Sequence, residues 1–192
     1  MADQYFSLIH QRRTYYSLSN QSPVTDERIR EVVERGLLDS PSSLNGRTSR
    51  AVVLLGVEHQ KLWDIALQVL KATFPAVIWP KYEQKLNDRK AAYGTILLYE
   101  DRTALHGLQT KVPMFAAHID QFSEHNHAIL AFDLWTALEL EGFGANLQHF
   151  NPWIDVAVAA HWNIPAVWSL KAQLVFRNPT AEPNPNKDWG GQ

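Results

Sequence analysis

Two arginines and a threonine stand together at positions 12 to 14, directly after a short amphipathic segment that runs from Asp3 to Gln11. A guanidinium offers a planar fork of N–H donors that matches phosphate oxygens, and a Thr hydroxyl adds a further donor. Arg12, Arg13 and Thr14 could therefore form a compact anion-binding cradle at a helix end. The alternative is a solvated basic helix end that only complements the helix dipole. Taken alone, the triplet favours that alternative.

A second group of polar residues lies in the predicted loop from Ser40 to Gly46. Ser42 and Ser43 supply small hydroxyl donors, and the amide of Asn45 presents both a donor and an acceptor, which suits the edge of a heteroaromatic ring. A plain turn explains the same composition. The loop is therefore a weak signal when it stands alone.

A third segment, from Gly142 to His149, begins with two glycines around Phe143 and ends with Gln148. Glycine has no side chain, so the backbone here could approach a flat cofactor closely. The same residues could simply end a helix and continue as a loop.

The fourth signal is a pair of polar side chains, Lys171 and Gln173, on a predicted strand. Alternate residues of a strand point to the same face, so both could reach one pocket. A lysine that protects an exposed strand edge is an equally good explanation for Lys171.

Several familiar chemistries are missing from the sequence. It contains no Gly-rich dinucleotide fingerprint, no phosphate-binding P-loop and no nucleophile elbow. His125 and His127 are two positions apart, so a regular helix would point them to different faces, and with His118 they do not predict a metal site. Helix-start polar residues, with Ser123 as a cap, explain that cluster. We predict no catalytic acid, base or nucleophile from a side chain.

Composition narrows the class of protein further. The 192 residues include no cysteine, which excludes disulfides, thiolate catalysis, Cys-ligated zinc and iron–sulfur clusters. A net charge of −2 provides no global field for nucleic acid or an anionic membrane. No apolar run approaches the roughly 20 residues that span a bilayer, and no secretory signal is evident. We therefore expect a cytoplasmic protein.

The apolar periodicity predicts an α+β fold in which helices outnumber strands around a central sheet. A single domain is expected over residues 1–176, followed by a Pro- and Asn-rich tail or arm over residues 177–192. Pro75 and Pro80 are expected to interrupt regular secondary structure. The segment 124–141 is apolar nearly all round, which is typical of a core helix or a subunit interface. Helices are predicted at 3–11, 25–39, 59–72, 104–122 with a break at Pro113, 124–141 and 154–162, and strands at 51–56, 95–99 and 170–176.

Taken together, and in this order along nearly the whole chain, the four segments resemble the nitroreductase family of FMN-dependent oxidoreductases. The matching motifs are Arg-Arg-Thr, Ser-Pro-Ser-Ser-Leu-Asn, Gly-Phe-Gly and Lys-Ala-Gln. Each motif is only moderately specific, and four in the correct order are much stronger. The short chain, the stretch 94–101 and the stretch 146–152 look most like the small fatty-acid-repression-mutant-like subgroup.

The resemblance implies a nitroreductase-like fold, with a mostly antiparallel central sheet flanked by helices, in an intertwined homodimer that holds FMN at the subunit interface. It implies reduction of FMN by NADH or NADPH in a ping-pong cycle, followed by hydride transfer to nitroaromatics, quinones or similar electron-poor acceptors. The cofactor supplies the hydride chemistry, and the protein supplies binding, orientation and electrostatics. That division fits a chain without an evident catalytic side chain.

The resemblance also assigns roles to individual residues. Arg12, Arg13, Thr14 and Lys171 would surround the phosphate and ribityl chain. Ser42, Ser43 and Asn45 would contact the flavin from the partner subunit. Gln148 and His149 would lie beside the isoalloxazine ring, largely through backbone groups. Gln173 stands where an Arg is often found, and Tyr16 where many members carry a base, so this cradle is less basic than in its relatives.

Two rival functions remain open from the sequence. One is a flavin-binding protein that senses or regulates with little turnover. The other is a small-molecule hydrolase or metal-binding domain that uses the histidines, which would be colourless and free of flavin.

Overall fold

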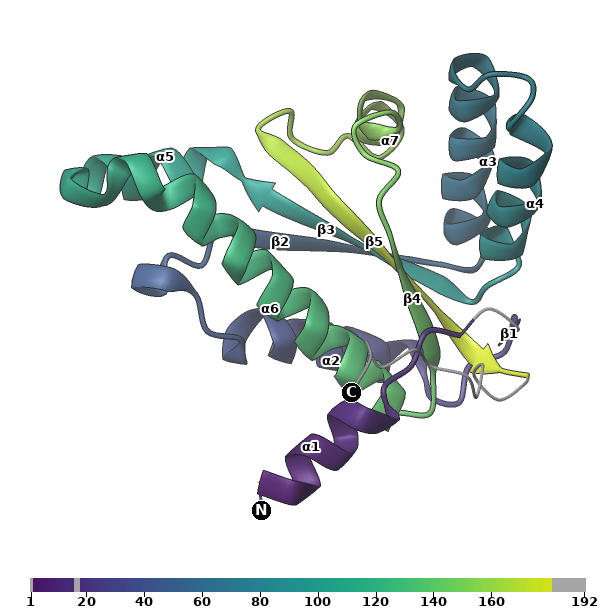
Figure 1. Ribbon diagram of the computed structural model, residues 1–192, viewed down its shortest axis with the longest axis horizontal. Coiled ribbons are helices and arrows are strands. Elements are labelled where there is room, and N and C mark those ends of the chain that lie inside the picture. The colour runs from purple at the N-terminus through teal and green to yellow at the C-terminus, as the bar shows by residue number, and fades with distance from the viewer. Residues whose placement is uncertain (1, 16–17, 181–192) are drawn as a thin grey trace, which may run out of the picture.

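A computed structural model describes residues 2–15 and 18–180 of the chain, so Tyr16 and residues 181–192 of the expected tail lie outside the described residues. The described part is a twisted antiparallel sheet with helices on both faces (Figure 1). Its elements, in chain order, are α1 Ala2–Gln11, β1 Leu18–Ser19, α2 Asp26–Asp39, η1 Ser43–Asn45, β2 Ser49–Leu55, α3 Gly56–Thr73, α4 Trp79–Lys90, β3 Gly94–Asp101, α5 Arg102–Lys111, η2 Pro113–His118, α6 Ile119–Leu140, β4 Gly144–Gln148, α7 Asp155–Trp162 and β5 Trp168–Pro179.

Strand β5 organises the sheet. One of its edges pairs with β3, which in turn pairs with β2, and the other edge pairs with β4 and, near the strand's end, with β1. Every one of these pairs is antiparallel. The expected α+β fold with an antiparallel central sheet flanked by helices is therefore confirmed.

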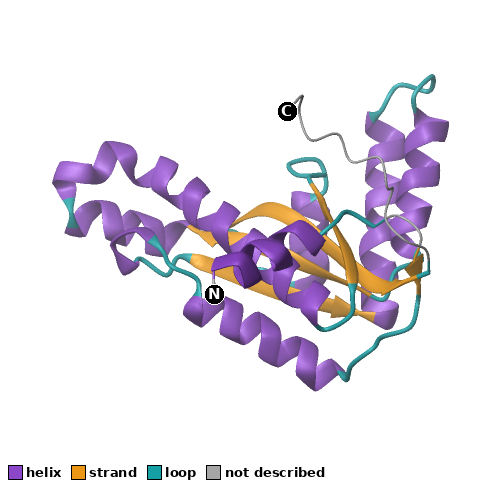
Figure 2. Ribbon diagram, turned by 60° about the horizontal axis from the view of Figure 1, so that its bottom comes forward, coloured by secondary structure: helices purple, strands orange, loops and turns teal. Residues whose placement is uncertain are grey.

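Two hydrophobic cores lie on opposite faces of the sheet because strand side chains alternate between faces. In β3, Ile96 and Leu98 join the core under α2 and α6, whereas Leu97 and Tyr99 join the core under α3, α4 and α7. Figure 2 shows the sheet enclosed between these helices. A strand buried on both faces reads as a continuous apolar run, which is why β3 was recognisable in the sequence.

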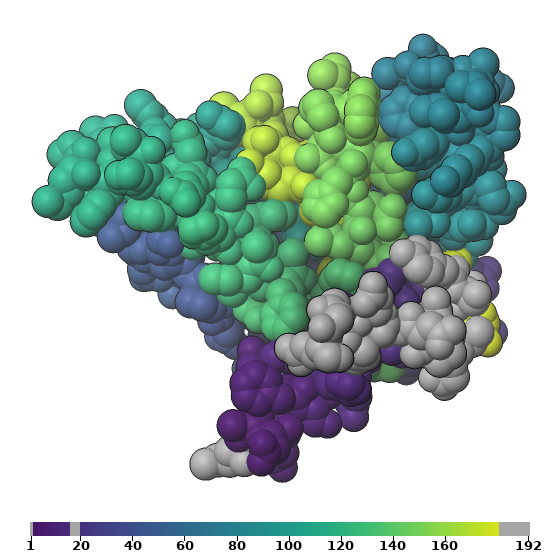
Figure 3. All heavy atoms as spheres, in the orientation of Figure 1, coloured from purple at the N-terminus to yellow at the C-terminus, as the bar shows by residue number. Residues whose placement is uncertain are grey.

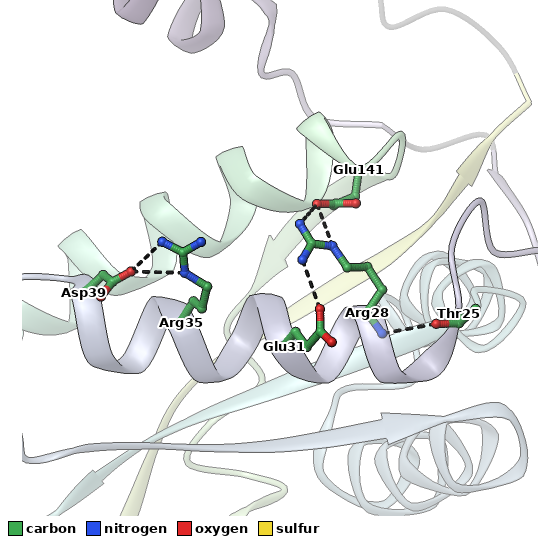
Figure 4. A network of polar contacts seen from close by, with 6 residues as sticks. All are labelled: Thr25, Arg28, Glu31, Arg35, Asp39 and Glu141. Atoms are coloured by element: carbon green, nitrogen blue, oxygen red, sulfur yellow. Dashed lines mark hydrogen bonds and ion pairs between the residues drawn. The ribbon is translucent and has the colours of Figure 1, made fainter.

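Polar contacts hold the first turns of helix α2. The Thr25 hydroxyl caps the helix by accepting a hydrogen bond from the Arg28 N–H at 3.2 Å. The Arg28 guanidinium then donates to Glu141, just beyond the end of α6, and to Glu31 (Figure 4). The contact with Glu141 joins the start of α2 to the end of α6, the helix that forms one wall of the candidate site.

The structure differs from the sequence predictions in several places. Pro80 does not interrupt the secondary structure but lies in the first turn of α4. Proline is tolerated there because the N–H groups of a helix's first turn have no partner within the helix. The segment after Gly142, for which a loop was one of the two alternatives, forms strand β4. Strand β5 continues to Pro179, so the first residues of the expected tail belong to the sheet.

Helix α6 starts earlier than expected, and this changes the role of Ser123. The residue lies inside the helix rather than at its cap, and its buried hydroxyl donates to a carboxylate oxygen of Glu100 at 2.5 Å. The prediction of a cap at Ser123 was wrong.

None of the described helices combines the length and the apolarity that crossing a bilayer would require.

A buried histidine joins α3 to the sheet and to α4. His59 is completely buried, and its Nε2 lies 3.0 Å from the Arg89 carbonyl, which can only accept, so Nε2 carries the proton. Its Nδ1 therefore accepts from the Thr95 hydroxyl at 2.9 Å, and that hydroxyl accepts from Trp63 Nε1. Burial lowers the pKa of His59 to about 4.

This pKa predicts acid sensitivity. The unfolded chain binds a proton at His59 near its ordinary pKa of 6.5, whereas the folded chain does so only near 4, so stability should fall as the pH drops between these values. The loss attributable to His59 should be about 2 to 3 kcal/mol. Urea unfolding at pH 7 and pH 4.5 should show a clearly smaller loss in His59→Gln than in the wild type. Equal losses in the two proteins would contradict this account.

Candidate functional site

The main pocket, with a volume of about 820 Å³, lies between α6, the beginning of β5 and the segment that joins β4 to α7. Figure 3 shows this face, with β5 in yellow between the green of α5 and α6 and the yellow-green of α7. Its lining combines basic, acidic and apolar side chains: Arg12, Thr14, Glu124, His127, Ala128, Ala131, Phe132, Trp135, Leu147, His149, Asn151, Pro152, Asp155, Ser169, Leu170 and Lys171.

Arg12 reaches the pocket from the end of α1. The helix stops at Gln11, and the Arg12 N–H still donates to the Leu8 carbonyl, so the side chain leaves from the last turn. Its guanidinium lies 4.4 Å from the ring centre of Trp135, a cation–π contact with α6. Its Nε is buried and has no hydrogen-bond partner among the described residues. A fixed cation with an unused donor is suited to an anion.

Thr14 is held at the pocket by the sheet. It forms an isolated parallel bridge with Ala145 of β4, and the next N–H, that of Tyr15, donates to the Ala145 carbonyl at 3.2 Å. The Asn146 side chain in turn donates to the Tyr15 carbonyl. The segment after α1 therefore extends the sheet beyond β4, which fixes where Arg12 and Thr14 lie.

Lys171 enters the pocket because β5 is irregular at that position. Leu98 pairs with Ala172 and the next residue, Tyr99, pairs with Leu170, so Lys171 is an extra residue without an opposite partner. Such bulges re-aim side chains and are often found near functional sites. The Lys171 ammonium forms an ion pair with the carboxylate of Glu124 on α6.

The same bulge separates Lys171 from Gln173. Regular alternation would have put both on one face, but the extra residue breaks the alternation, and Gln173 does not line the pocket. Instead, Gln173 is completely buried, accepts from the Phe150 N–H at 2.8 Å and donates to the Asn151 side chain. Gln173 thus supports the loop that forms one wall of the pocket.

That loop contributes His149 to the pocket, as the sequence had indicated for this segment. Its neighbour Gln148 ends β4 and donates from its side-chain amide to Asn146 at 2.9 Å, outside the pocket lining. Gly142 has a φ of +89°, and the Phe143 N–H donates to the Leu138 carbonyl, so the glycine ends α6 as a C-cap before β4 begins.

The two neighbouring arginines face different hollows. Arg13 does not line the main pocket; it lines a separate hollow with Glu139, whose carboxylate accepts a hydrogen bond from the Arg13 backbone N–H at 3.0 Å. Burial raises the pKa of Glu139. Successive residues beyond a helix end leave in different directions, which the sequence could not resolve.

Ser42, Ser43 and Asn45 also lie outside the main pocket of their own chain. The Ser43 N–H and hydroxyl both donate to Asn126 of α6, and Ser42 lines a further hollow that Asn126 shares. Asn45 accepts from the Arg47 side chain. Asn126 and His127, consecutive in α6, therefore face different hollows.

Among the pocket residues that the sequence did not predict as contacts, His127 and Asp155 combine an ionisable side chain with burial of at least one of its polar atoms. His127 lines the pocket from α6. His125, two positions earlier in the same helix, faces another direction and is exposed. Asp155 lines the pocket from the start of α7, and its Oδ1 is buried without a hydrogen-bond partner in the described ranges. Neither belongs to a recognisable motif. Within residues 2–15 and 18–180, no group of three or more metal-ligating side chains could hold an ion.

The position of Asp155 predicts an unusual pH effect. Burial raises its pKa from 3.8 to about 6, so the folded state is favoured below pH 3.8 and this advantage disappears as the pH rises through 6. Asp155→Asn should therefore stabilise the protein at pH 7 by about 1 kcal/mol, after discounting for partial exposure. Urea unfolding should show no such gain near pH 3.5. A loss of stability at pH 7 would mean that the carboxylate has a favourable partner.

Comparison with known proteins shows which family this arrangement belongs to. Residues 9–176 match the Nitroreductase family. The putative nitroreductase HBN1 and the nitroreductase FRM2, both from Saccharomyces cerevisiae, are each 32% identical over 181 residues, which cover 93% of this chain and 90% of each relative.

Solved structures agree. The nitroreductase CinD from Lactococcus lactis in complex with 4-nitrophenol has a TM-score of 0.85 and 37% identity, with 96% of this chain and 94% of that one covered. A nitroreductase from Saccharomyces cerevisiae has a TM-score of 0.81 and 28% identity, with coverage of 95% and 99%. The family match extends over most of the chain, including Arg12, Thr14 and Lys171. The chain therefore belongs to the nitroreductase family.

Proposed function

We propose that the protein is a cytoplasmic FMN-dependent oxidoreductase that uses NADH or NADPH to reduce nitroaromatics, quinones or similar electron-poor compounds in a ping-pong cycle. The observation that carries the proposal is the main pocket, where Arg12 and Lys171 provide fixed positive charge in a chain whose net charge is −2. A local cation pair in a slightly acidic protein has a clear use if the ligand is an anion.

The pocket residues fit FMN. Arg12 and Lys171 supply charged donors and Thr14 a hydroxyl for the phosphate and ribityl chain, and the buried Arg12 Nε still lacks an acceptor. Glu124, the present partner of Lys171, is 59% exposed and can turn into solvent when a phosphate approaches. A volume of about 820 Å³ lies in the usual range of cofactor sites, which is roughly 300 to 1,000 Å³.

When bound, FMN would accept a hydride from the nicotinamide and pass it to the acceptor. The chain's own residues would bind and orient the cofactor and exclude water. An apolar wall is formed by Ala128, Ala131 and Leu147. The loop that carries His149 is held by the hydrogen bond from the Phe150 N–H to the buried Gln173 side chain. No side-chain nucleophile or acid–base pair is required.

Structures of related proteins support the choice of cofactor and acceptor. FMN is bound in the structures of a putative nitroreductase from Desulfovibrio desulfuricans and of a nitroreductase from Desulfitobacterium hafniense. These proteins are 18% and 13% identical to this chain, so their likeness to it concerns the fold alone. CinD, at 36 to 37% identity, has been solved with the nitroaromatic compounds 4-nitrophenol and chloramphenicol. Flat nitro compounds are therefore the first acceptors to test.

A homodimer is part of the proposal. None of the ten residues of α1 is buried, and Tyr5 and Phe6 are 56% and 63% exposed on this helix, which projects from the body (Figure 3). An isolated helix shorter than about 12 residues is marginal in water, so α1 needs a second surface. A partner subunit would provide it, and the partner subunit would also bring Ser42, Ser43 and Asn45 to the flavin.

Flavin binding should distinguish the two neighbouring arginines. Arg12→Ala removes a charged donor in the pocket and should weaken FMN binding by about 10- to 100-fold, the range expected for a hydrogen bond to a charged group. Arg13→Ala, next in the chain but facing another hollow, should change it by less than about threefold. Fluorescence quenching of FMN gives both constants. Equal losses in the two variants would contradict the assignment of Arg12.

The reaction itself is tested by the visible spectrum. The protein reconstituted with FMN should show an oxidised-flavin spectrum that NADH or NADPH bleaches anaerobically and that a nitroaromatic or quinone restores. Failure to bind FMN would overturn the proposal. Flavin binding with negligible steady-state turnover would instead indicate a sensor or regulator.

The dimer is tested by its mass. Sedimentation should give twice the 21.9 kDa of the chain, and Phe6→Glu should shift the protein towards the monomer with a loss of helical content no larger than the ten residues of α1. Val77→Glu, an equally drastic change at an 86% exposed position between α3 and α4, should leave the dimer intact. A wild-type monomer at micromolar concentration would contradict this part of the proposal.

A further inference from the structure

His127 is almost completely buried, yet it contacts no polar partner in the described part of the chain. It is 8% exposed, and neither of its ring nitrogens has a hydrogen-bond partner among the described residues. Buried polar groups are nearly always hydrogen-bonded, and exceptions in native proteins need an explanation. Because His127 lines the main pocket, a ligand in that pocket is the natural partner.

The surroundings of His127 determine what it can offer. Burial lowers its pKa to about 4, an effect that Lys171 and His149 strengthen and Glu124 opposes. These three groups face the imidazole from β5, from the loop after β4 and from its own helix. At neutral pH the ring is therefore uncharged, with one N–H donor and one acceptor nitrogen.

Neighbouring residues of α6 do not compete for this position. Asn126 faces the other side of the helix, where it accepts from Ser43, and His125 is exposed. Lys171, turned into the pocket at the bulge in β5, pairs with Glu124, which stands three residues before His127 on the same face of α6. An anionic oxygen placed at Lys171 would therefore lie next to an unused imidazole N–H.

We propose that His127 is a further cofactor-binding residue, which donates a hydrogen bond from its neutral imidazole to the FMN phosphate beside Lys171. The inference rests on the proposed function. It adds to the cradle a donor that carries no charge of its own, so the pocket gains a contact to phosphate without gaining a third fixed cation.

The test compares FMN with riboflavin, which has the same ring and ribityl chain but no phosphate. In the full-length protein, His127→Ala and His127→Phe should each weaken FMN binding at least tenfold and riboflavin binding less than twofold. The two variants differ in side-chain volume, so either one that folds, as judged by circular dichroism, is sufficient. His127→Gln keeps an N–H donor and should retain FMN affinity to within threefold of the wild type.

His125→Phe, two residues away and exposed, serves as the matched control and should not change either affinity. Equal losses for FMN and riboflavin, or unchanged FMN binding, would overturn the inference. So would dissociation of the protein into monomers without a loss specific to FMN, because the imidazole would then serve the subunit interface. A wild-type protein that binds riboflavin and FMN equally badly would instead overturn the proposed function, and this inference with it.

Discussion

The pairing of β5 along both of its edges is the interaction on which the rest of the structure depends. This strand joins β3 and β2 on one side to β4 and β1 on the other, and its side chains contribute to both hydrophobic cores. The candidate site uses the same strand. Its bulge turns Lys171 into the pocket, and its buried Gln173 holds the loop that carries His149. A displacement of β5 would therefore disturb the cores and the pocket together.

The main pocket contains buried polar atoms without hydrogen-bond partners in the described residues, which costs folding stability. Buried polar atoms elsewhere in proteins are almost always hydrogen-bonded. Here, polar atoms of Arg12, His127, Trp135 and Asp155 are buried without partners among the described residues, and all four side chains line the same pocket. Local rules are expected to fail at functional sites, where a ligand rather than the chain completes the interactions. Five of the twelve such atoms in the described residues lie in this one pocket, which argues for a ligand more strongly than any single residue does.

Local patterns in the sequence predicted most of the fold, because helical periodicity and buried apolar runs report directly on the elements that form the cores. Strand β4 could not be recognised, since its Gly-Ala-Asn-Leu-Gln sequence has no strong strand preference and is held by pairing with β5. Three of the four segments singled out in the sequence contribute to the main pocket, with Arg12 and Thr14, His149, and Lys171, whereas Ser42, Ser43 and Asn45 of the other segment lie outside it. The motifs could not separate Arg12 from Arg13 or Lys171 from Gln173, because a helix end and a bulge decide those directions.

The electrostatics of the pocket follow from burial rather than from the net charge of the chain. Burial raises the pKa of Asp155 and lowers that of His127, so it favours the neutral form of both. The side chain of Glu124 is largely exposed, so solvent screens its interactions. At pH 7 the Asp155 carboxyl is still mostly ionised, because its raised pKa is about 6, and the positive charges of the pocket are those of Arg12 and Lys171. A protein with a formal charge of −2 thus places two cations, rather than a basic surface, where an anionic cofactor would sit.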